Sequence, residues 1–266
     1  ASTADEPELN LGRALDTRSG GLFLFDRDQQ LVDSVSYGFQ IRNLSLGRNG
    51  SSWRLLTAPT PGSSNAPIAA LGLINHLRLN EWMADNMGPG GLADPADGLF
   101  QDWIELFNPN TNAVNLGGYH LTDIFANPTK FTIPSNTVIA AQGFLLVWAD
   151  EDGSQNSPTN RDLHANFRLS AGGEELGLFA PDGLSPQHTV VMCPQVRNVS
   201  QGLFPDGAVG PVYCMTNWTP RSPRATWRTR ARSSSGSAAS TPSCSAPSPA
   251  ARTATSPGAR SRPARS

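Results

Sequence analysis

The sequence of 266 residues predicts an all-β fold, an antiparallel β-sandwich. Three observations lead to this fold class. Short runs alternate apolar and polar residues with the period of a half-buried strand. Turn-forming residues bound these runs, and no stretch of 12 residues shows helical spacing with caps. Seven or more such strands over about 140 residues are typical of a sandwich.

The expected strands follow one another between residues 77 and 192. The first alternates apolar and polar residues, whereas 144–148 is a continuous apolar run, as expected for a central strand covered on both faces. Pro181-Asp182-Gly183 predicts a hairpin turn between the last two strands. In chain order the expected strands are 77–82, 103–107, 119–122, 130–133, 137–139, 144–148, 175–179 and 189–192.

Charge is divided unevenly along the chain. Residues 1–220 hold all 22 acidic residues and 11 of the 20 basic ones, a net charge of −11, whereas residues 221–266 hold nine Arg and no acid. Because phosphate contacts need clustered cations, the acidic part is not expected to bind nucleic acid. No apolar run approaches the roughly 18 residues of a membrane span, so no membrane span is expected.

Residues 221–266 differ sharply from the rest in composition. Arg, Ser, Ala, Pro, Thr and Gly make up all of this segment except Trp227 and Cys244, so it cannot bury enough apolar surface to offset its ordering entropy and is predicted to be disordered. The abundant residue types have GC-rich codons and the change is abrupt. A frameshifted reading frame is therefore favoured over a genuine disordered tail, which would act as a basic arm for nucleic acid or an acidic surface.

An internal repeat sets the expected domain boundaries. Residues 40–47 match 195–202, and Thr60-Pro61 answers Thr219-Pro220. The correspondence ends at Arg221, where the composition changes, which supports the frameshift interpretation. The expected organisation is the C-terminal half of a first domain (1–65), a linker with one or two weak helical turns (66–76), a near-complete second domain (77–220) and the tail (221–266).

Motifs of known catalytic chemistry are absent from the sequence. It has no G-x-S-x-G, Walker, G-x-G-x-x-G or H-E-x-x-H pattern. Asp162 lies near His164, but no motif connects a nucleophile to them. The histidines are scattered and are expected to be surface or strand residues rather than ligands: His76, His120, His164 and His188. We therefore predict no catalytic, cofactor-binding or metal-binding residues.

Two acidic stretches are candidate calcium loops, because calcium prefers several hard oxygen ligands. One comprises Asp85, Asp94, Asp97 and Asp102 around the glycine-rich loop 88–91, and the other is Asp150-Glu151-Asp152-Gly153. The second stretch does not fit an EF-hand, since Trp148 stands where the first Asp belongs and no Glu is in place. Solvated turns, with each Asp hydrogen-bonded to its own backbone, are favoured over calcium sites.

Other residues leave alternatives open. Cys193 and Cys214 form one disulfide in an exported protein or are two small buried side chains, the favoured reading. The tryptophans stack on sugars or, when they lie in alternating strands, belong to the core, which is favoured; they are Trp53, Trp82, Trp103, Trp148 and Trp218. Asn43, Asn49, Asn198 and Asn217 fit the N-glycosylation pattern.

Several segments, taken in their order along the chain, together resemble one known family. They are 79–86, 102–109, 114–123, 127–131, 143–150, 163–174 and the closing Thr219-Pro220. This series is similar to lamin tail domains as they occur in bacterial surface proteins. The resemblance covers 77–220 and, as a C-terminal half, 9–65.

The resemblance implies an immunoglobulin-like sandwich of the lamin-tail type, without catalytic residues. Such domains resemble accessory modules of large exported proteins, so we expect a non-catalytic binding or structural module at the cell surface or outside the cell. Its partners would be a protein or polysaccharide surface ligand and neighbouring domains. Two alternatives remain: an accessory fragment of an extracellular hydrolase, nuclease or spore-coat-H-type kinase whose catalytic domain lies elsewhere, and nucleic-acid binding through the basic tail.

Overall fold

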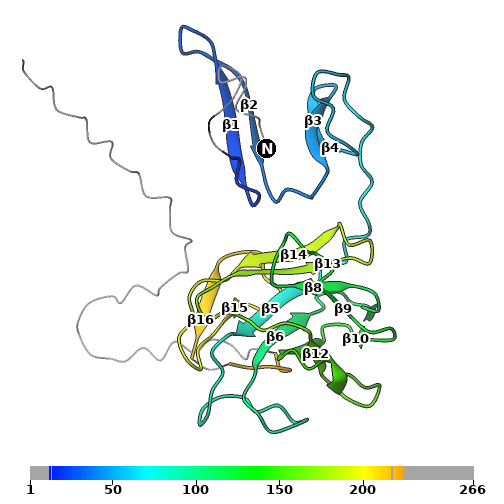
Figure 1. The fold of residues 1–266 in the computed structure, drawn as a ribbon, viewed down its shortest axis with the longest axis vertical. Coiled ribbons are helices and arrows are strands. Elements are labelled where there is room, and N and C mark those ends of the chain that lie inside the picture. Colours follow the sequence, from blue (N-terminus) through cyan, green and yellow to red (C-terminus); the bar gives the residue numbers. More distant parts are fainter. Residues whose placement is uncertain (1–11, 13, 217, 224–266) are drawn as a thin grey trace, which may run out of the picture.

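The structure, a computed structural model, describes residue 12, residues 14–216 and residues 218–223 (Figure 1). The predicted disordered tail from residue 224 on, with Trp227 and Cys244, lies outside the described residues, as does Asn217. The described chain is built from strands and loops, with one short 3-10 helix, η2 (Gly153–Gln155). The all-β prediction is therefore confirmed.

Two sheets form an immunoglobulin-like sandwich, as expected. The larger sheet has the strand order β12-β11-β6-β5-β15-β16, and the smaller has the order β14-β13-β8-β9. A short ribbon of β7 (Val114–Asn115) and β10 (Val138–Ile139) lies outside both. The strands of the larger sheet are β5 (Arg78–Met83), β6 (Asp102–Phe107), β11 (Phe144–Ala149), β12 (Leu163–Ala165), β15 (Ser200–Leu203) and β16 (Val212–Met215), and those of the smaller are β8 (His120–Thr122), β9 (Phe131–Thr132), β13 (Glu175–Phe179) and β14 (Pro186–Val191).

Alternation along the strands produces the main core between the sheets. From the larger sheet, Trp82, Ile104 and Val147 point into the core, where they are fully buried together with Leu121 and Leu178 of the smaller sheet. Because successive residues of a strand face opposite ways, the intervening side chains lie on the other face of the larger sheet.

The other face of the larger sheet is also covered. Met83, Trp103, Leu146 and Trp148 form a second buried cluster there, with Trp218 packed against it. The continuous apolar run of β11 is therefore explained, as predicted, by burial on both faces.

All eight expected strands are present, and the predicted hairpin joins β13 to β14 in antiparallel register. Sequence patterns missed β7, β12, β15 and β16 here and the four strands between residues 20 and 56. β15 carries Ser200 and Gln201 at buried positions, where Ser200 Oγ donates a hydrogen bond to Glu81 of β5. Since burial here depends on polar partners from other strands, no apolar alternation signals the strand. β12 pairs with β11 in parallel, the exception in this otherwise antiparallel sandwich.

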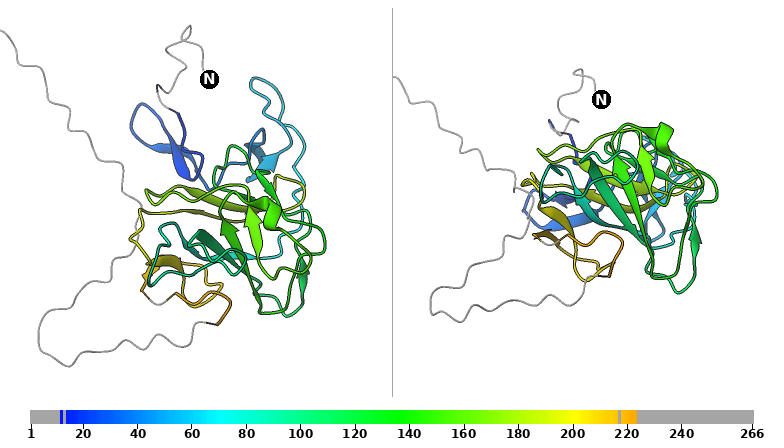
Figure 2. Two further views of the ribbon diagram at one scale, coloured as in Figure 1. Left: turned by 60° about the horizontal axis from the view of Figure 1, so that its bottom comes forward. Right: turned by 90° about the horizontal axis from the view of Figure 1, so that it is seen from below.

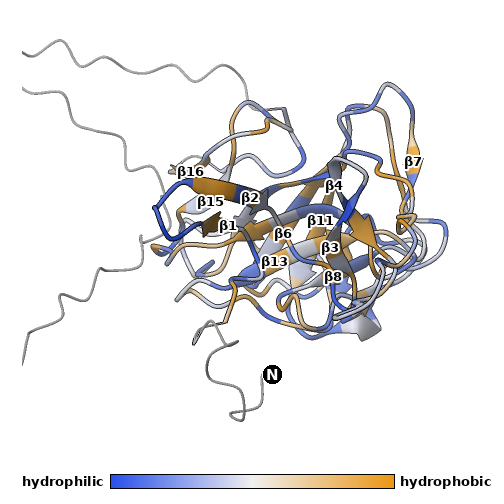
Figure 3. Ribbon diagram, turned by 90° about the horizontal axis from the view of Figure 1, so that it is seen from above, coloured by the Kyte–Doolittle hydropathy of each residue, from blue (hydrophilic) through white to orange (hydrophobic). Residues whose placement is uncertain are grey.

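Two further hairpins precede the sandwich. β1 (Gly20–Phe25) pairs with β2 (Leu31–Tyr37), and β3 (Ser45–Asn49) pairs with β4 (Ser52–Leu56), each as a separate two-stranded sheet. Figures 1 and 2 show both hairpins on the side of the sandwich that β13 and β14 form. Seen from that side, they lie in front of the sandwich (Figure 3).

The linker 66–76 is extended, so the expected helical turns were wrong. Its first half pairs with β4, where the Ala69 N–H donates to the Leu55 carbonyl at 2.9 Å, and its second half is held by side chains of the β13–β14 hairpin. The Gly72 N–H donates to Ser185 Oγ at 2.7 Å, and the Asn75 N–H donates to Gln187 Oε1 at 2.7 Å. Gln187 in turn donates from Nε2 to the Leu73 carbonyl at 3.0 Å. These tertiary bonds satisfy groups that a helical turn would otherwise pair locally.

Candidate functional site

Three titratable side chains that are distant in sequence meet beyond the ends of two neighbouring strands. Asp94 lies in the loop between β5 and β6, Asp150 directly follows β11, and His164 is the central residue of β12. All three are buried, and one ligand-type atom from each lies within 4.8 Å of the others. The parallel pairing of β11 with β12, which sets Trp148 opposite His164, brings Asp150 and His164 together.

In both Asp94 and Asp150, one carboxylate oxygen accepts a backbone hydrogen bond and the other faces the imidazole of His164. Asp94 Oδ1 accepts a hydrogen bond from the Ala96 N–H at 2.8 Å, and Asp150 Oδ1 accepts one from the Asp152 N–H at 3.0 Å. Asp150 Oδ2 then lies 2.7 Å from His164 Nδ1. Asp94 Oδ2 lies 3.6 Å from the same nitrogen and, although buried, has no hydrogen-bond partner.

The side chain of Asn156 holds the backbone of His164 in place. The His164 N–H donates to Asn156 Oδ1 at 2.9 Å, and the His164 carbonyl accepts from Asn156 Nδ2 at 2.7 Å. Burial of Asp94 raises the pKa of its carboxyl group, because a charged carboxylate loses hydration there. The cluster is therefore rigidly built and electrostatically costly, which is typical of functional sites.

A cleft of about 290 Å³ opens beside the cluster. Asp94 and His164 lie in its wall, together with Asp162, Arg161 and Arg221. Arg221 forms an ion pair with Asp162, and its N–H donates to Glu105 Oε2 at 2.6 Å. Arg221, assigned above to the tail, thus lies against the sandwich and forms part of this wall.

The acidic stretches differ from the expected solvated turns in one respect. As predicted, Asp carboxylates accept bonds from nearby backbone, for example Asp97 Oδ1 from the Leu99 N–H at 2.8 Å. Asp97 is exposed, but Asp94 and Asp150 are only 1% and 3% exposed, so the expectation of solvation was wrong for these two. The reason is tertiary: one residue of each stretch turns inward toward His164.

The other candidate acids remain apart from this cluster. Asp85 pairs with Arg197 at 3.4 Å, and Glu151 pairs with Arg168 at 3.1 Å on the surface. Burial raises the pKa of Asp102 to about 6. Asp162 accepts a hydrogen bond from Trp148 Nε1 at 3.3 Å and forms an ion pair with Arg221.

The histidines lie where the sequence suggested, in strands or on the surface. His120, His164 and His188 belong to β8, β12 and β14, and His76 is exposed. Sequence reasoning nevertheless missed the surroundings of His164. The sequence does show that His164 follows Asp150 by 14 residues, within the segment 163–174 that resembles the family. It does not show that β11 and β12 pair in parallel, which is what makes the two residues neighbours.

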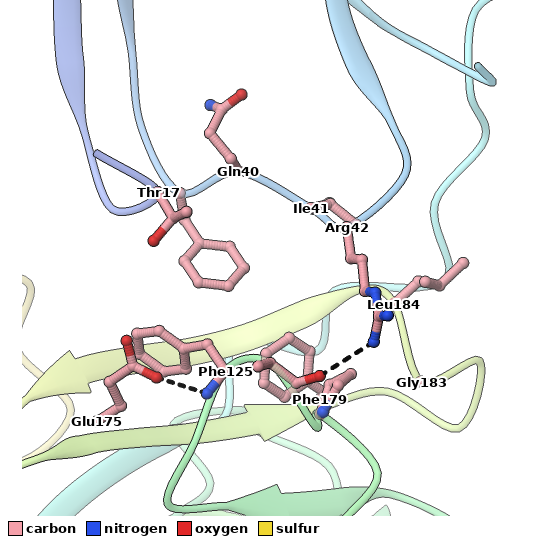
Figure 4. A pocket seen from close by; sticks show the side chains of 12 residues that line it. Thr17, Gln40, Ile41, Arg42, Phe125, Glu175, Phe179, Gly183 and Leu184 are labelled. Atoms are coloured by element: carbon pink, nitrogen blue, oxygen red, sulfur yellow. Dashed lines mark hydrogen bonds between the residues drawn. The ribbon is translucent and has the colours of Figure 1, made fainter. Parts of the chain in front are cut away.

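A second cleft, of about 360 Å³, separates the N-terminal hairpins from the smaller sheet (Figure 4). Phe39 packs edge-on against Phe125 with ring centroids 5.0 Å apart, and it lies 6.1 Å from the ring of Phe179. Arg42 donates to the Ala126 carbonyl at 3.3 Å. Gly177 lies under these rings, where a Cβ would come within 2.6 Å of Phe179. These contacts seat the hairpins on the sandwich.

The remaining candidates are now placed. Trp82, Trp103 and Trp148 are fully buried, as expected for core residues, whereas Trp53 is 37% exposed. No disulfide joins Cys193 and Cys214. The side-chain amide of Asn198 accepts a hydrogen bond from the Met87 N–H and donates one to the Met87 carbonyl. Asn43 and Asn49 are exposed.

Comparisons with known proteins show a similarity for one region of the chain. Among the described residues, no helix has the length and apolar character needed to cross a membrane. No curated protein matches the chain. A family profile described as Lamin Tail Domain matches residues 74–191, from the linker to the end of β14. This family is immunoglobulin-like and non-enzymatic. The chain therefore contains a region similar to lamin tail domains, and that region builds most of the sandwich.

Proposed function

We propose that this chain is a non-catalytic binding or structural module of a larger exported multidomain bacterial protein. It acts at the cell surface or outside the cell, on a protein or polysaccharide ligand. The observation that carries the proposal is the structural correspondence between the two N-terminal hairpins and the last two hairpins of the sandwich, together with the exposure of the former.

The spacing of the strands supports a partial first copy of the domain. β1, β2 and β3 begin at residues 20, 31 and 45, and β13, β14 and β15 begin at residues 175, 186 and 200, so the three starts keep the same spacing. Asn43 lies two positions before β3, and Asn198 lies two positions before β15. Both have a left-handed backbone, with φ of 63° and 57°.

Two loop hydrogen bonds also recur at corresponding positions. The Gln40 N–H donates to the Thr17 carbonyl at 2.7 Å, as the Gln195 N–H donates to the Ala171 carbonyl at 2.8 Å. The Ser63 N–H donates to the Thr60 carbonyl at 3.2 Å, as the Ser222 N–H donates to the Thr219 carbonyl at 3.2 Å. The two halves therefore share turns as well as strands.

The corresponding strands differ in their partners. β13 pairs with β8 and β15 pairs with β5, so each of these hairpins is joined to one sheet of the sandwich. Among the described residues, β1 and β3 pair only with β2 and β4, and every residue of β1 is exposed, including Phe23 and Phe25. Isolated two-stranded ribbons are marginally stable in water and leave open edges. This pattern favours a module that works within a larger assembly.

Two experiments test the proposal. Antibodies raised against the folded chain should label intact source cells, and external protease should remove the label; labelling only after permeabilisation would refute an exported module. Immobilised chain should retain a protein or polysaccharide from the source cell envelope. Retention of nucleic acid instead, lost on deletion of residues 221–266, would favour the basic-tail alternative.

A further inference from the structure

We infer that Asp94, Asp150 and His164 form a binding site for one divalent transition-metal ion of the Mn²⁺ or Zn²⁺ class. This inference does not rest on the proposed function. It begins from the three buried side chains described above, which come from two loops and a strand and offer two carboxylate oxygens and one imidazole nitrogen within 4.8 Å of one another.

The unpartnered oxygen of Asp94 is the observation that points to a ligand. A buried carboxylate oxygen normally has a hydrogen-bond donor, since an unsatisfied one costs free energy. Asp94 is 1% exposed, yet its Oδ2 has no hydrogen-bond partner and faces His164 Nδ1 at 3.6 Å. A cation between these atoms would supply the missing interaction.

The geometry fits a small ion with only minor side-chain movement. Ligand bonds of about 2.0–2.2 Å place the donor atoms roughly 3–3.5 Å apart around a metal. The distances from His164 Nδ1 to the two carboxylate oxygens, 2.7 Å and 3.6 Å, bracket this range. The second oxygen of each carboxylate already accepts a backbone hydrogen bond, from Ala96 or Asp152, which orients the first as outer-shell contacts do in metal sites.

The donor set selects the class of ion. Calcium takes six to eight oxygen ligands and magnesium keeps mostly oxygen ligands and water, so an imidazole favours a transition metal. Two carboxylates balance the charge of a divalent ion. Asp94 and His164 also lie in the wall of the 290 Å³ cleft, which gives the ion an entry path and leaves coordination positions for water. Arg161 and Arg221 line the same cleft, and their charge opposes the binding of a cation.

The test uses the full chain after removal of metal with a chelator. Calorimetric titration with Mn²⁺ or Zn²⁺ should give one ion per chain and raise the melting temperature, whereas Ca²⁺ and Mg²⁺ should bind more weakly. Paramagnetic Mn²⁺ should broaden the imidazole NMR signals of His164 before those of the half-buried His120. This last measurement needs no variant.

Matched variants locate the ion. Asp94→Asn and Asp150→Asn should each weaken binding at least about tenfold, while Asp97→Asn, in an exposed turn of the same loop, should not. Circular dichroism of the metal-free variants establishes that they fold. The inference is overturned if neither ion binds, if Ca²⁺ binds more tightly, if Mn²⁺ broadens other histidines first, or if folded Asp94→Asn binds as the parent chain does.

Discussion

Gly62 and Arg221 occupy equivalent positions in two turns, each directly after a Thr-Pro pair, and both have a left-handed backbone, with φ of 73° and 68°. Glycine adopts this conformation without strain, but arginine does not. We predict that Arg221→Gly is more stable than Arg221→Ala by about 1 kcal/mol, since both lose the ion pair with Asp162 but only alanine keeps the strain.

Urea unfolding of the two variants measures this difference. Gly62→Ala is the matched substitution in the first turn and should lower the free energy of unfolding by a similar amount. Equal stability of Arg221→Gly and Arg221→Ala would contradict the prediction. A glycine preference at position 221 also agrees with the interpretation that the reading frame changes there, which translation of the other two frames after Pro220 tests directly.

Phe39 seats the N-terminal hairpins on the smaller sheet through Phe125 and Phe179. Phe39→Ala should therefore speed amide exchange and proteolytic cleavage in β1–β4 and leave the main unfolding transition of the sandwich unchanged. Phe23→Ala is the control, because Phe23 is 61% exposed. If Phe39→Ala leaves exchange in β1–β4 unaltered, the aromatic contact does not hold the hairpins in place.

His188 should make the sandwich sensitive to acid. Burial lowers the pKa of His188 to about 4, with the charge of Arg78 acting in the same direction, and His188 Nδ1 accepts a hydrogen bond from the Leu79 N–H at 3.3 Å. Since the unfolded pKa is about 6.5, the stability is full above that pH and is lost as the pH falls toward 4, by up to about 3 kcal/mol. His188→Gln should flatten this dependence in urea titrations at pH 7, 5.5 and 4, whereas His76→Gln, at an exposed site, should leave it intact.

Asp102 should act in the opposite sense. Its pKa is raised to about 6, chiefly by burial, so the folded chain binds a proton more tightly than the unfolded chain, whose pKa is about 3.9. Its contribution is most favourable below pH 4 and declines as the pH rises through 6. Asp102→Asn should raise the free energy of unfolding by about 2 kcal/mol at pH 8 and by little at pH 4. An equal effect at both pH values would count against the raised pKa, and Asp97→Asn, in an exposed turn, provides the baseline.

The sequence predicted most strands of the sandwich because their signal is local. The alternation in β5 and β6, the apolar run of β11 and the turn after β13 depend only on residues within each segment. The buried tryptophans followed from the same alternation. β15 was not predicted because its buried positions carry Ser200 and Gln201. Their side chains form hydrogen bonds with Glu81, Trp82 and a backbone carbonyl from other parts of the chain.

Local sequence patterns predicted eight strands between residues 77 and 192, the internal repeat and the abrupt change in composition at Arg221, because each of these is a property of contiguous residues. Contacts between distant segments, by contrast, establish that the linker is extended along β14, that β12 runs parallel to β11 and that Asp94, Asp150 and His164 meet. These features are not local, because the order of strands in a sheet, and not the pattern within each strand, sets which loops converge at its edge. Two acidic stretches that separately resemble ordinary turns thus each contribute one buried carboxylate to the same histidine.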